Sequence, residues 1–165
     1  MLPLELLSTL LHILAVALWV GAMVFFLVVL GPSVNALEPR IAIQTLNRGR
    51  IGFERLSWIA IALLLLTGVF NLLQRLSIST LATEEFYFVI LTIKLCLFGA
   101  MLALHLLQTF RYAPAIAKLT SELPGLPNHW PEGLLGQWRR WFLLLKINAA
   151  LGPIAILLGL NLLKA

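Results

Sequence analysis

The chain has 165 residues, of which 61% are apolar and 12% charged, with a formal net charge of +5 and a mean hydropathy of +0.97. A soluble domain carries about twice that share of charged residues, so the composition predicts an integral membrane protein. The basic residues lie beside apolar segments and form no soluble patch, which argues against a nucleic-acid-binding protein. We expect a single membrane domain over residues 1–165.

Four apolar segments are each long enough to cross a bilayer. A span needs roughly 20 predominantly apolar residues, and such segments lie at residues 4–30, 53–76, 86–111 and 138–163. Continuous apolar runs without alternation indicate helices, because lipid offers no hydrogen-bond partners to an open backbone. The sequence therefore predicts an all-α fold, an integral membrane four-helix bundle.

The segments between the spans give further expectations. The first span is expected to be retained and not cleaved as a signal peptide, because no basic region precedes it and no Ala-x-Ala site follows it. Gly31-Pro32 is expected to end the first helix, and a short interfacial helix is predicted near residues 41–47. Residues 118–137 hold six Pro and Gly residues, which predicts an ordered, non-helical connection.

Positive charge is unequal on the two sides of the predicted bundle. Four spans place both termini and the connection 77–85 on one side, which carries Arg75 and Lys164. The other side carries Arg40, Arg48, Arg50, Arg55, Arg111, Lys118, Arg139 and Arg140. The positive-inside rule therefore predicts a multi-pass protein of the bacterial inner membrane with both termini on the outer, periplasmic side.

Two of the predicted spans carry the same residue spacing. In each, three residues lie seven and then four positions apart, which places them on one face of a helix. They are His12, Trp19 and Met23 in the first span, and Lys94, Met101 and His105 in the third. Both spans run in the same direction, so the two patterns are expected to meet at similar depths.

The rise of about 1.5 Å per residue divides these residues into two levels. The outer level is expected to pair His12 with Lys94, with Asn71 of the second span close by. The inner level is expected to contain Met23, Met101 and His105, with Lys146 of the fourth span. The two histidines are expected to lie roughly 20 Å apart in depth, so they should not bind one metal ion together.

Each of these residues has a functional and a structural interpretation. A lysine within the membrane costs at least ~2.5 kcal/mol, so Lys94 is expected to face the bundle interior or a polar cavity. Alternatively, Lys94 extends to the interface, and His12 makes a structural hydrogen bond. Met23 and Met101 are alternatively apolar filler. Cys96, about 200° around the helix from Lys94, is expected to face lipid or a neighbouring helix.

Other kinds of chemistry find no support in the sequence. It contains no phosphate-binding glycine loop, no zinc-ligand spacing and no pair of carboxylates within a span, which disfavours a proton pump or a carboxylate-driven transporter. Arg111, Arg139 and Arg140 are expected to form an inner basic rim. Such a rim anchors the spans and can bind lipid headgroups or a haem propionate.

Short motifs in all four spans occur in a recognisable order. The first span has His12-x6-Trp19-x-Gly21, the second closes on Leu-Leu-Thr-Gly at residues 65–68, the third opens with Lys-Leu at residues 94–95, and the fourth contains LLLKINAALGPIAILL. This set resembles the CopD copper-resistance family of bacterial inner-membrane proteins. The resemblance implies copper uptake or resistance, usually alongside a periplasmic copper carrier.

The first and third spans also resemble the HemJ-type protoporphyrinogen oxidases, which are four-span proteins with a b-type haem. Their first-span His, and their Lys eleven residues before a second His, match His12, Lys94 and His105. That family has a Pro-Arg pair and a further His after the first-span Trp, whereas this chain has FFLVVLGPSV there. The departure disfavours porphyrinogen oxidation.

Three hypotheses follow, with copper or haem b as the candidate cofactor. In the first, copper binds at the candidate ligands His12, Met23, Met101 and His105, with Lys94, Asn71 and Trp19 tuning the site; copper(I) prefers thioethers and accepts imidazole. In the second, a haem oxidoreductase uses His12 as axial ligand and His105 as the candidate second ligand, while Lys94 binds a ligand or steers a propionate. In the third, the protein is a scaffold or assembly factor without a cofactor. Membrane lipid is the expected surrounding, and a homodimer is compatible with each hypothesis.

Overall fold

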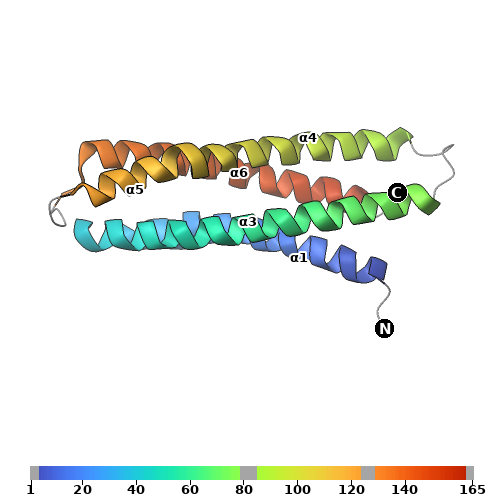
Figure 1. The fold of residues 1–165 in the computed structure, drawn as a ribbon, viewed down its shortest axis with the longest axis horizontal. Helices are drawn as coiled ribbons and strands as arrows, with labels where there is room; N and C mark the ends of the chain where they lie inside the picture. Colours follow the sequence, from blue (N-terminus) through green and yellow to red (C-terminus); the bar gives the residue numbers. More distant parts are fainter. Residues whose placement is uncertain (1–3, 79–84, 124–128, 163–165) are drawn as a thin grey trace.

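The computed structural model describes residues 4–78, 85–123 and 129–162, and all regular structure within them is helical. In chain order the elements are α1 (Leu4–Phe25), the π-helical η1 (Phe26–Leu30), α2 (Gly31–Val34), α3 (Pro39–Ile78), α4 (Glu85–Leu107), the π-helical η2 (Gln108–Tyr112), α5 (Ala113–Ser121) and α6 (Glu132–Leu162) (Figure 1). The predicted all-α fold is confirmed.

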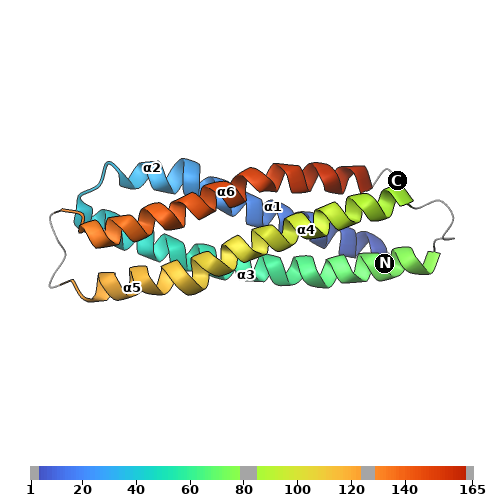
Figure 2. The ribbon, with the colours of Figure 1, turned by 90° about the horizontal axis from the view of Figure 1, so that it is seen from above.

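The elements form four long rods, because η1 continues α1 into α2 and η2 continues α4 into α5 (Figure 2). Each rod is long and apolar enough to cross a membrane, over residues 4–34, 39–76, 87–121 and 132–159. α1 begins and α6 ends at the same end of the bundle. Which side of the membrane that end faces stays a prediction.

The first helix does not end at Gly31-Pro32, contrary to expectation. A proline inside an α-helix lacks an N–H and collides with the carbonyl of the preceding turn. Here the turn before Pro32 is widened to a π-helix, in which the N–H of Gly31 bonds to the carbonyl of Phe26, five residues back. The same arrangement, on the carbonyl of Gln108, precedes Pro114. Both rods therefore continue through their proline, as π-bulges allow.

Two other predictions about the connections are wrong. Residues 41–47 are not a separate interfacial helix but part of α3, which begins at Pro39, a residue suited to the first position of a helix. Residues 118–121 and 132–137 are helical, in α5 and α6, so the connection is shorter than predicted; residues 124–128 lie outside the described part. The composition indicated connections that are too long because Pro39 begins α3 and Pro131 directly precedes α6.

The length of α3 brings a charged side chain into the bundle. Arg50 is 5% exposed. Its guanidinium bonds to the carboxylate of Glu54 at 2.8 Å and to the side-chain oxygen of Asn47 at 2.8 and 3.3 Å. A buried charge is tolerated only when paired and hydrogen-bonded. Arg50 is therefore a buried residue of α3 and not part of an exposed basic connection.

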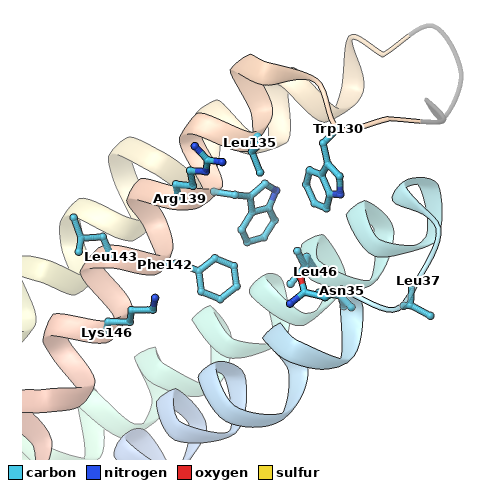
Figure 3. A pocket seen from close by; sticks show the side chains of 11 residues that line it. Asn35, Leu37, Leu46, Trp130, Leu135, Arg139, Phe142, Leu143 and Lys146 are labelled. Carbon is cyan, nitrogen blue, oxygen red and sulfur yellow. The ribbon is translucent and has the colours of Figure 1, made fainter.

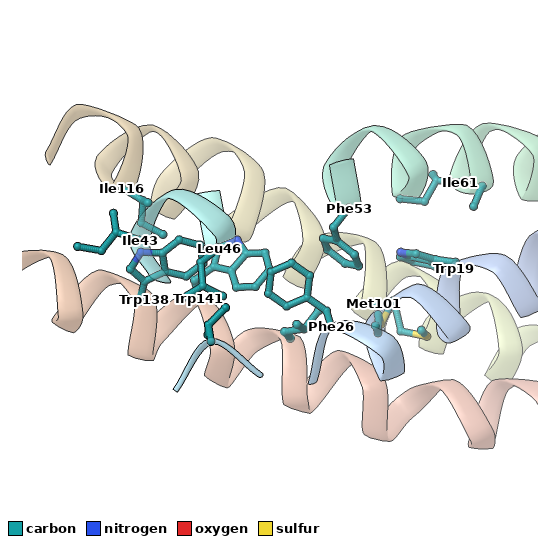
Figure 4. Packing of buried hydrophobic residues seen from close by; sticks show 14 of the residues in the cluster. Trp19, Phe26, Ile43, Leu46, Phe53, Ile61, Met101, Ile116, Trp138 and Trp141 are labelled. Carbon is teal, nitrogen blue, oxygen red and sulfur yellow. The ribbon is translucent and has the colours of Figure 1, made fainter. Parts of the chain in front are cut away.

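The helices pack as two pairs. α1 lies against α3, and α4 and α5 lie against α6, while α1 and η1 join the two pairs through their contacts with α6. The buried apolar side chains form one continuous cluster along the bundle, from Ile43 and Trp138 at one end to Ile61 at the other (Figure 4).

The two halves of the chain repeat one design. Four buried positions of α1, η1 and α2 recur 82 positions later: Trp19 with Met101, Met23 with His105, Phe26 with Gln108, and Val34 with Ile116. Both π-helices occupy the same place in this register. Six buried positions of α3 recur 88 positions later in α6: Leu46 with Leu134, Arg50 with Trp138, Phe53 with Trp141, Ser57 with Leu145, Ala60 with Asn148, and Leu64 with Gly152. Each half is one helix pair.

Candidate functional site

A fully buried histidine lies at the centre of the bundle. His105 of α4 is 0% exposed. Its ring lies 6.2 Å from that of Trp19, 6.1 Å from that of Phe53 and 5.3 Å from that of Trp58, measured between centroids. Trp19 belongs to α1, and the other two rings belong to α3. The imidazole of the second half therefore points into the first half.

Neither ring nitrogen of His105 has a hydrogen-bond partner among the described residues. The same interior holds further buried polar atoms without a partner in that part of the chain: the indole nitrogens of Trp19, Trp138 and Trp141, the hydroxyl of Ser57, and the side-chain oxygens of Gln108 and Asn148. Each buried polar group without a partner costs about 1–3 kcal/mol. The core is therefore lined by apolar side chains but carries several polar atoms without a partner in the described part of the chain.

Two thioethers lie in the same region. Met23 is 0% and Met101 2% exposed, and both belong to the buried cluster that contains Trp19. Figure 4 shows Met101 beside Trp19. Met23 lies one helical turn after Trp19 on α1, and Met101 lies one turn before His105 on α4, so the predicted inner-level residues of the first and third spans all face the interior.

Lys146 does not join the inner level. It is exposed and lines a pocket at the end of the bundle. α6 directs Leu145 and Asn148 inward, and at 100° per residue Lys146 lies about 100° and 200° away from them around the helix. The predicted depth of Lys146 along its span matches that of His105, but its position around the axis of α6 directs its side chain away from the core.

Sequence reasoning missed two buried amides that join α4 and η2 to α6. The side-chain nitrogen of Gln108 donates to the backbone carbonyl of Trp141 at 3.1 Å, and that of Asn148 donates to the carbonyl of Met101 at 3.1 Å. Gln108 extends the pattern of the third span by three residues beyond His105, and Asn148 interrupts an apolar run. Those two features were the available indications.

At the outer level, the imidazole of His12 is held in one orientation. Its Nδ1 lies 2.8 Å from the hydroxyl oxygen of Thr67 on α3. That hydroxyl donates its only hydrogen to the carbonyl of Leu63 at 2.6 Å, so it must accept from Nδ1–H. Nε2 then carries the lone pair that a metal ion requires, as in histidine ligands oriented by a second partner.

Lys94 lies at the same level and is half-buried. It lies over Gly159 of α6, where an added methyl group would be 3.5 Å from the Lys94 Nζ. Lys94 lies within electrostatic range of the imidazole of His12. Asn71 is half-buried, and its side chain makes no hydrogen bond with another described residue. The pairing of His12 with Lys94 and the part of Asn71 in a site stay predictions.

The three arginines of the predicted rim do not share a site. All three are exposed. Arg139 lines the pocket at the end of the bundle, and Arg111 lies in a shallow groove on α4 and η2 with Leu107 and Phe110. Cys96 is exposed on the bundle surface, as one of the two interpretations of its position required.

Among the described residues, no three His, Cys, Asp or Glu side chains gather at one point. A metal site in the core would therefore depend on thioethers. Residues 50–160 of the chain match the family model of copper resistance protein D. The chain belongs to the CopD family. The matched region includes Lys94, Met101 and His105, and it excludes the first span.

One curated relative extends this finding. Copper resistance protein D of Pseudomonas syringae pv. tomato is 34% identical to the chain over 112 residues, which are 67% of the chain and 36% of the relative. The chain thus spans about a third of the length of that CopD protein. No solved structure matches the chain. Family membership and four long apolar helices make the chain a copper-resistance-related, multi-pass membrane protein.

Proposed function

We propose that this CopD-family protein carries Cu(I) through the inner membrane and binds it at the core site, which comprises His105, Met23 and Met101. The observation that supports the proposal is a fully buried imidazole with both nitrogens unpartnered among the described residues, in a region that also holds two buried thioethers. Soft thioethers select Cu(I), and imidazole is an acceptable further ligand. Copper is the cargo in this proposal. The aromatic rings around the core site separate the bound ion from water.

His12 is proposed as the first ligand at the outer end. Its Nε2 is available because Thr67 engages Nδ1. His12 and Met23 are eleven residues apart on one rod, about 16 Å, so the ion binds them in succession and not together. The positive charge of Lys94 beside His12 lowers the affinity there and favours onward movement. We further propose a periplasmic copper carrier as the donor, with both termini on that side.

The haem hypothesis has less support from the packing. A porphyrin coordinated by His105 would displace the rings of Trp19, Phe53 or Trp58, which lie 5.3–6.2 Å from the imidazole. Neither of the two pockets at the bundle surface includes His12 or His105. The residues around the core site therefore fit a single ion better than a macrocycle.

The decisive experiment measures Cu(I) binding to the full chain purified in detergent, under reducing conditions, against a coloured Cu(I) chelator. We expect about one bound Cu(I) per chain. His105→Leu should weaken binding at least ~100-fold, which corresponds to about 2.7 kcal/mol. Cys96→Ser is the matched control, because the thiol of this cysteine is a strong Cu(I) ligand that is exposed on the bundle surface.

Three outcomes would overturn the proposal. Unchanged Cu(I) affinity in His105→Leu removes the core site, and loss of binding in Cys96→Ser assigns the copper to the surface thiol. A Soret band from stoichiometric haem in the purified protein, without copper, would establish the haem hypothesis instead. Neither copper nor haem would leave the scaffold hypothesis.

A further inference from the structure

A pocket of about 600 Å³ lies at the end of the bundle where α2 meets α3 and α6 begins, and its lining includes none of the core-site residues (Figure 3). Its walls are mainly apolar and come from both halves of the chain. They include Val34 and Leu46 from the first half, and Trp130, Trp138 and Phe142 from the second. The pocket is large enough for part of an organic ligand.

Two cations stand on one side of this pocket. Arg139 and Lys146 are seven residues apart on α6, which places them on one face of the helix. Both are exposed, and neither forms an ion pair with a described residue. Between them α6 presents Phe142 and Leu143 to the pocket (Figure 3). The lining thus combines two unneutralised positive charges with an apolar surface.

A third feature also indicates a ligand. The side chain of Trp138 lines the pocket and is 2% exposed, and its indole N–H has no partner among the described residues. A buried N–H donor without an acceptor is costly. An oxygen-bearing ligand in the pocket can supply that acceptor.

We propose that this pocket binds one anionic phospholipid. Its phosphate contacts the guanidinium of Arg139 and the ammonium of Lys146, and its acyl chain covers the apolar wall. Arg139 is seven residues, about 10 Å, from the start of α6, where a spanning helix meets the phosphate layer of a bilayer. Basic pockets between spanning helices bind anionic headgroups, and a guanidinium binds phosphate through two hydrogen bonds. A free anion would leave the apolar wall uncovered.

The proposed lipid has a structural consequence that is independent of copper. The pocket is lined by α2 and α3 on one side and by α6 on the other, so the lipid touches both halves of the chain. A ligand that binds only the assembled bundle stabilises it by mass action. Anionic lipid is therefore expected to raise the unfolding temperature.

The test uses the full chain in neutral detergent micelles, with dioleoylphosphatidylglycerol and dioleoylphosphatidylcholine as probes. Native mass spectrometry counts the bound lipids, and circular dichroism follows unfolding. We expect the wild-type chain to bind the anionic lipid at least ~10-fold more tightly than the neutral one. The double variant Arg139→Gln/Lys146→Gln should lose this preference and the rise in unfolding temperature.

The matched control removes the same charge nearby. Arg140 and Lys118 are exposed at the same end of the bundle and do not line the pocket. Arg140→Gln/Lys118→Gln should keep the wild-type preference. An equal loss in this control would mean a general charge effect. Displacement of the lipid by inorganic phosphate would mean a phosphate site, and a chain dimer without bound lipid would mean a protein interface; each result overturns the proposal.

Discussion

The first half of the chain, α1 to α3, and the second half, α4 to α6, bury equivalent positions with different chemistry. Met23 in the first half corresponds to His105 in the second, Phe26 to Gln108, and Ala60 to Asn148. Each pair is buried, so the positions are set by one packing pattern. The pattern fixes where a side chain enters the core, and the side chain decides what the core can bind. At these three pairs, the imidazole and both amides belong to the second half.

The two helix pairs are also held together differently. α4 and α6 exchange two hydrogen bonds between amide side chains and backbone carbonyls, through Gln108 and Asn148. Among the described residues, the one side-chain hydrogen bond found between α1 and α3 runs from His12 to Thr67, and the buried cluster supplies apolar contact between the two helices. Hydrogen bonds between spanning helices contribute only about 0.6 kcal/mol on average. The amides therefore fix the rotation of α4, and with it the direction of His105, more than they add stability.

Exchanging the chemistry of one equivalent pair gives the largest expected effect. His105→Leu should weaken Cu(I) binding at least ~100-fold. Adding Met23→His to that variant should recover the affinity to within ~10-fold of wild type, because position 23 is equally buried and enters the same core from α1. Chelator competition measures both values.

The comparison fails if the double variant binds Cu(I) no better than His105→Leu while its circular dichroism spectrum is that of the folded wild-type chain. The halves would then share a packing pattern but not a site. Met23→His alone is the control for an imidazole that binds copper independently of the core.

A second test concerns a contact between the two halves at which the two equivalent residues differ in size. Leu64 of α3 corresponds to Gly152 of α6. A Cβ at Gly152 would lie 3.0 Å from both Cγ atoms of Val20 on α1. The branched side chain of Val20 has little freedom to move, so Gly152→Ala should cost about 1–3 kcal/mol of unfolding free energy.

Gly21 provides the matched control, because a Cβ there meets nothing within 4 Å. Gly21→Ala should not lower the unfolding free energy and should raise it by up to about 1 kcal/mol, because alanine favours a helix more than glycine does. Reversible unfolding in mixed micelles measures both variants. Equal effects of the two substitutions would show that the close approach of α1 and α6 does not limit the packing.

The sequence predicted the fold class, but only part of the inner level. Apolar run length depends only on local composition, so the four spans were visible. The spacing of seven and then four residues correctly directed Trp19, Met101 and His105 to the interior, because helical periodicity determines the face. The continuation of the rods past Pro32 and Pro114 was not predictable, since a π-helix forms from backbone hydrogen bonds that no residue type specifies.

The partners of the site residues were harder to predict. The orientation of α6 about its own axis directs Asn148, and not Lys146, into the core. That orientation depends on tertiary packing. The bond from His12 to Thr67 joins residues 55 positions apart. The sequence showed Thr67 only as part of a family motif, without its contact. Periodicity within one helix is local, but the register between helices is set by side chains from all four rods.

The smallest expected effect isolates the only side-chain hydrogen bond found between α1 and α3 within the described residues. Thr67→Val keeps the shape of the side chain and removes the acceptor of His12 Nδ1–H. The expected loss of unfolding free energy is about 0.6 kcal/mol and at most about 1.7 kcal/mol. Thr92→Val is the matched control, because the hydroxyl of Thr92 bonds only to the carbonyl of its own helix, at Phe88.

Thr92→Val should therefore leave stability within about 0.5 kcal/mol of wild type. Both threonine variants lose a hydrogen bond from the hydroxyl to a carbonyl of the same helix, which for Thr67 is the carbonyl of Leu63. A double-mutant cycle of Thr67→Val with His12→Ala separates the His12–Thr67 coupling energy from that loss. Zero coupling in that cycle would mean that the first half is joined by apolar packing alone. His12 would then be free to rotate, and the orientation of Nε2 as the outer copper ligand would lose its structural basis.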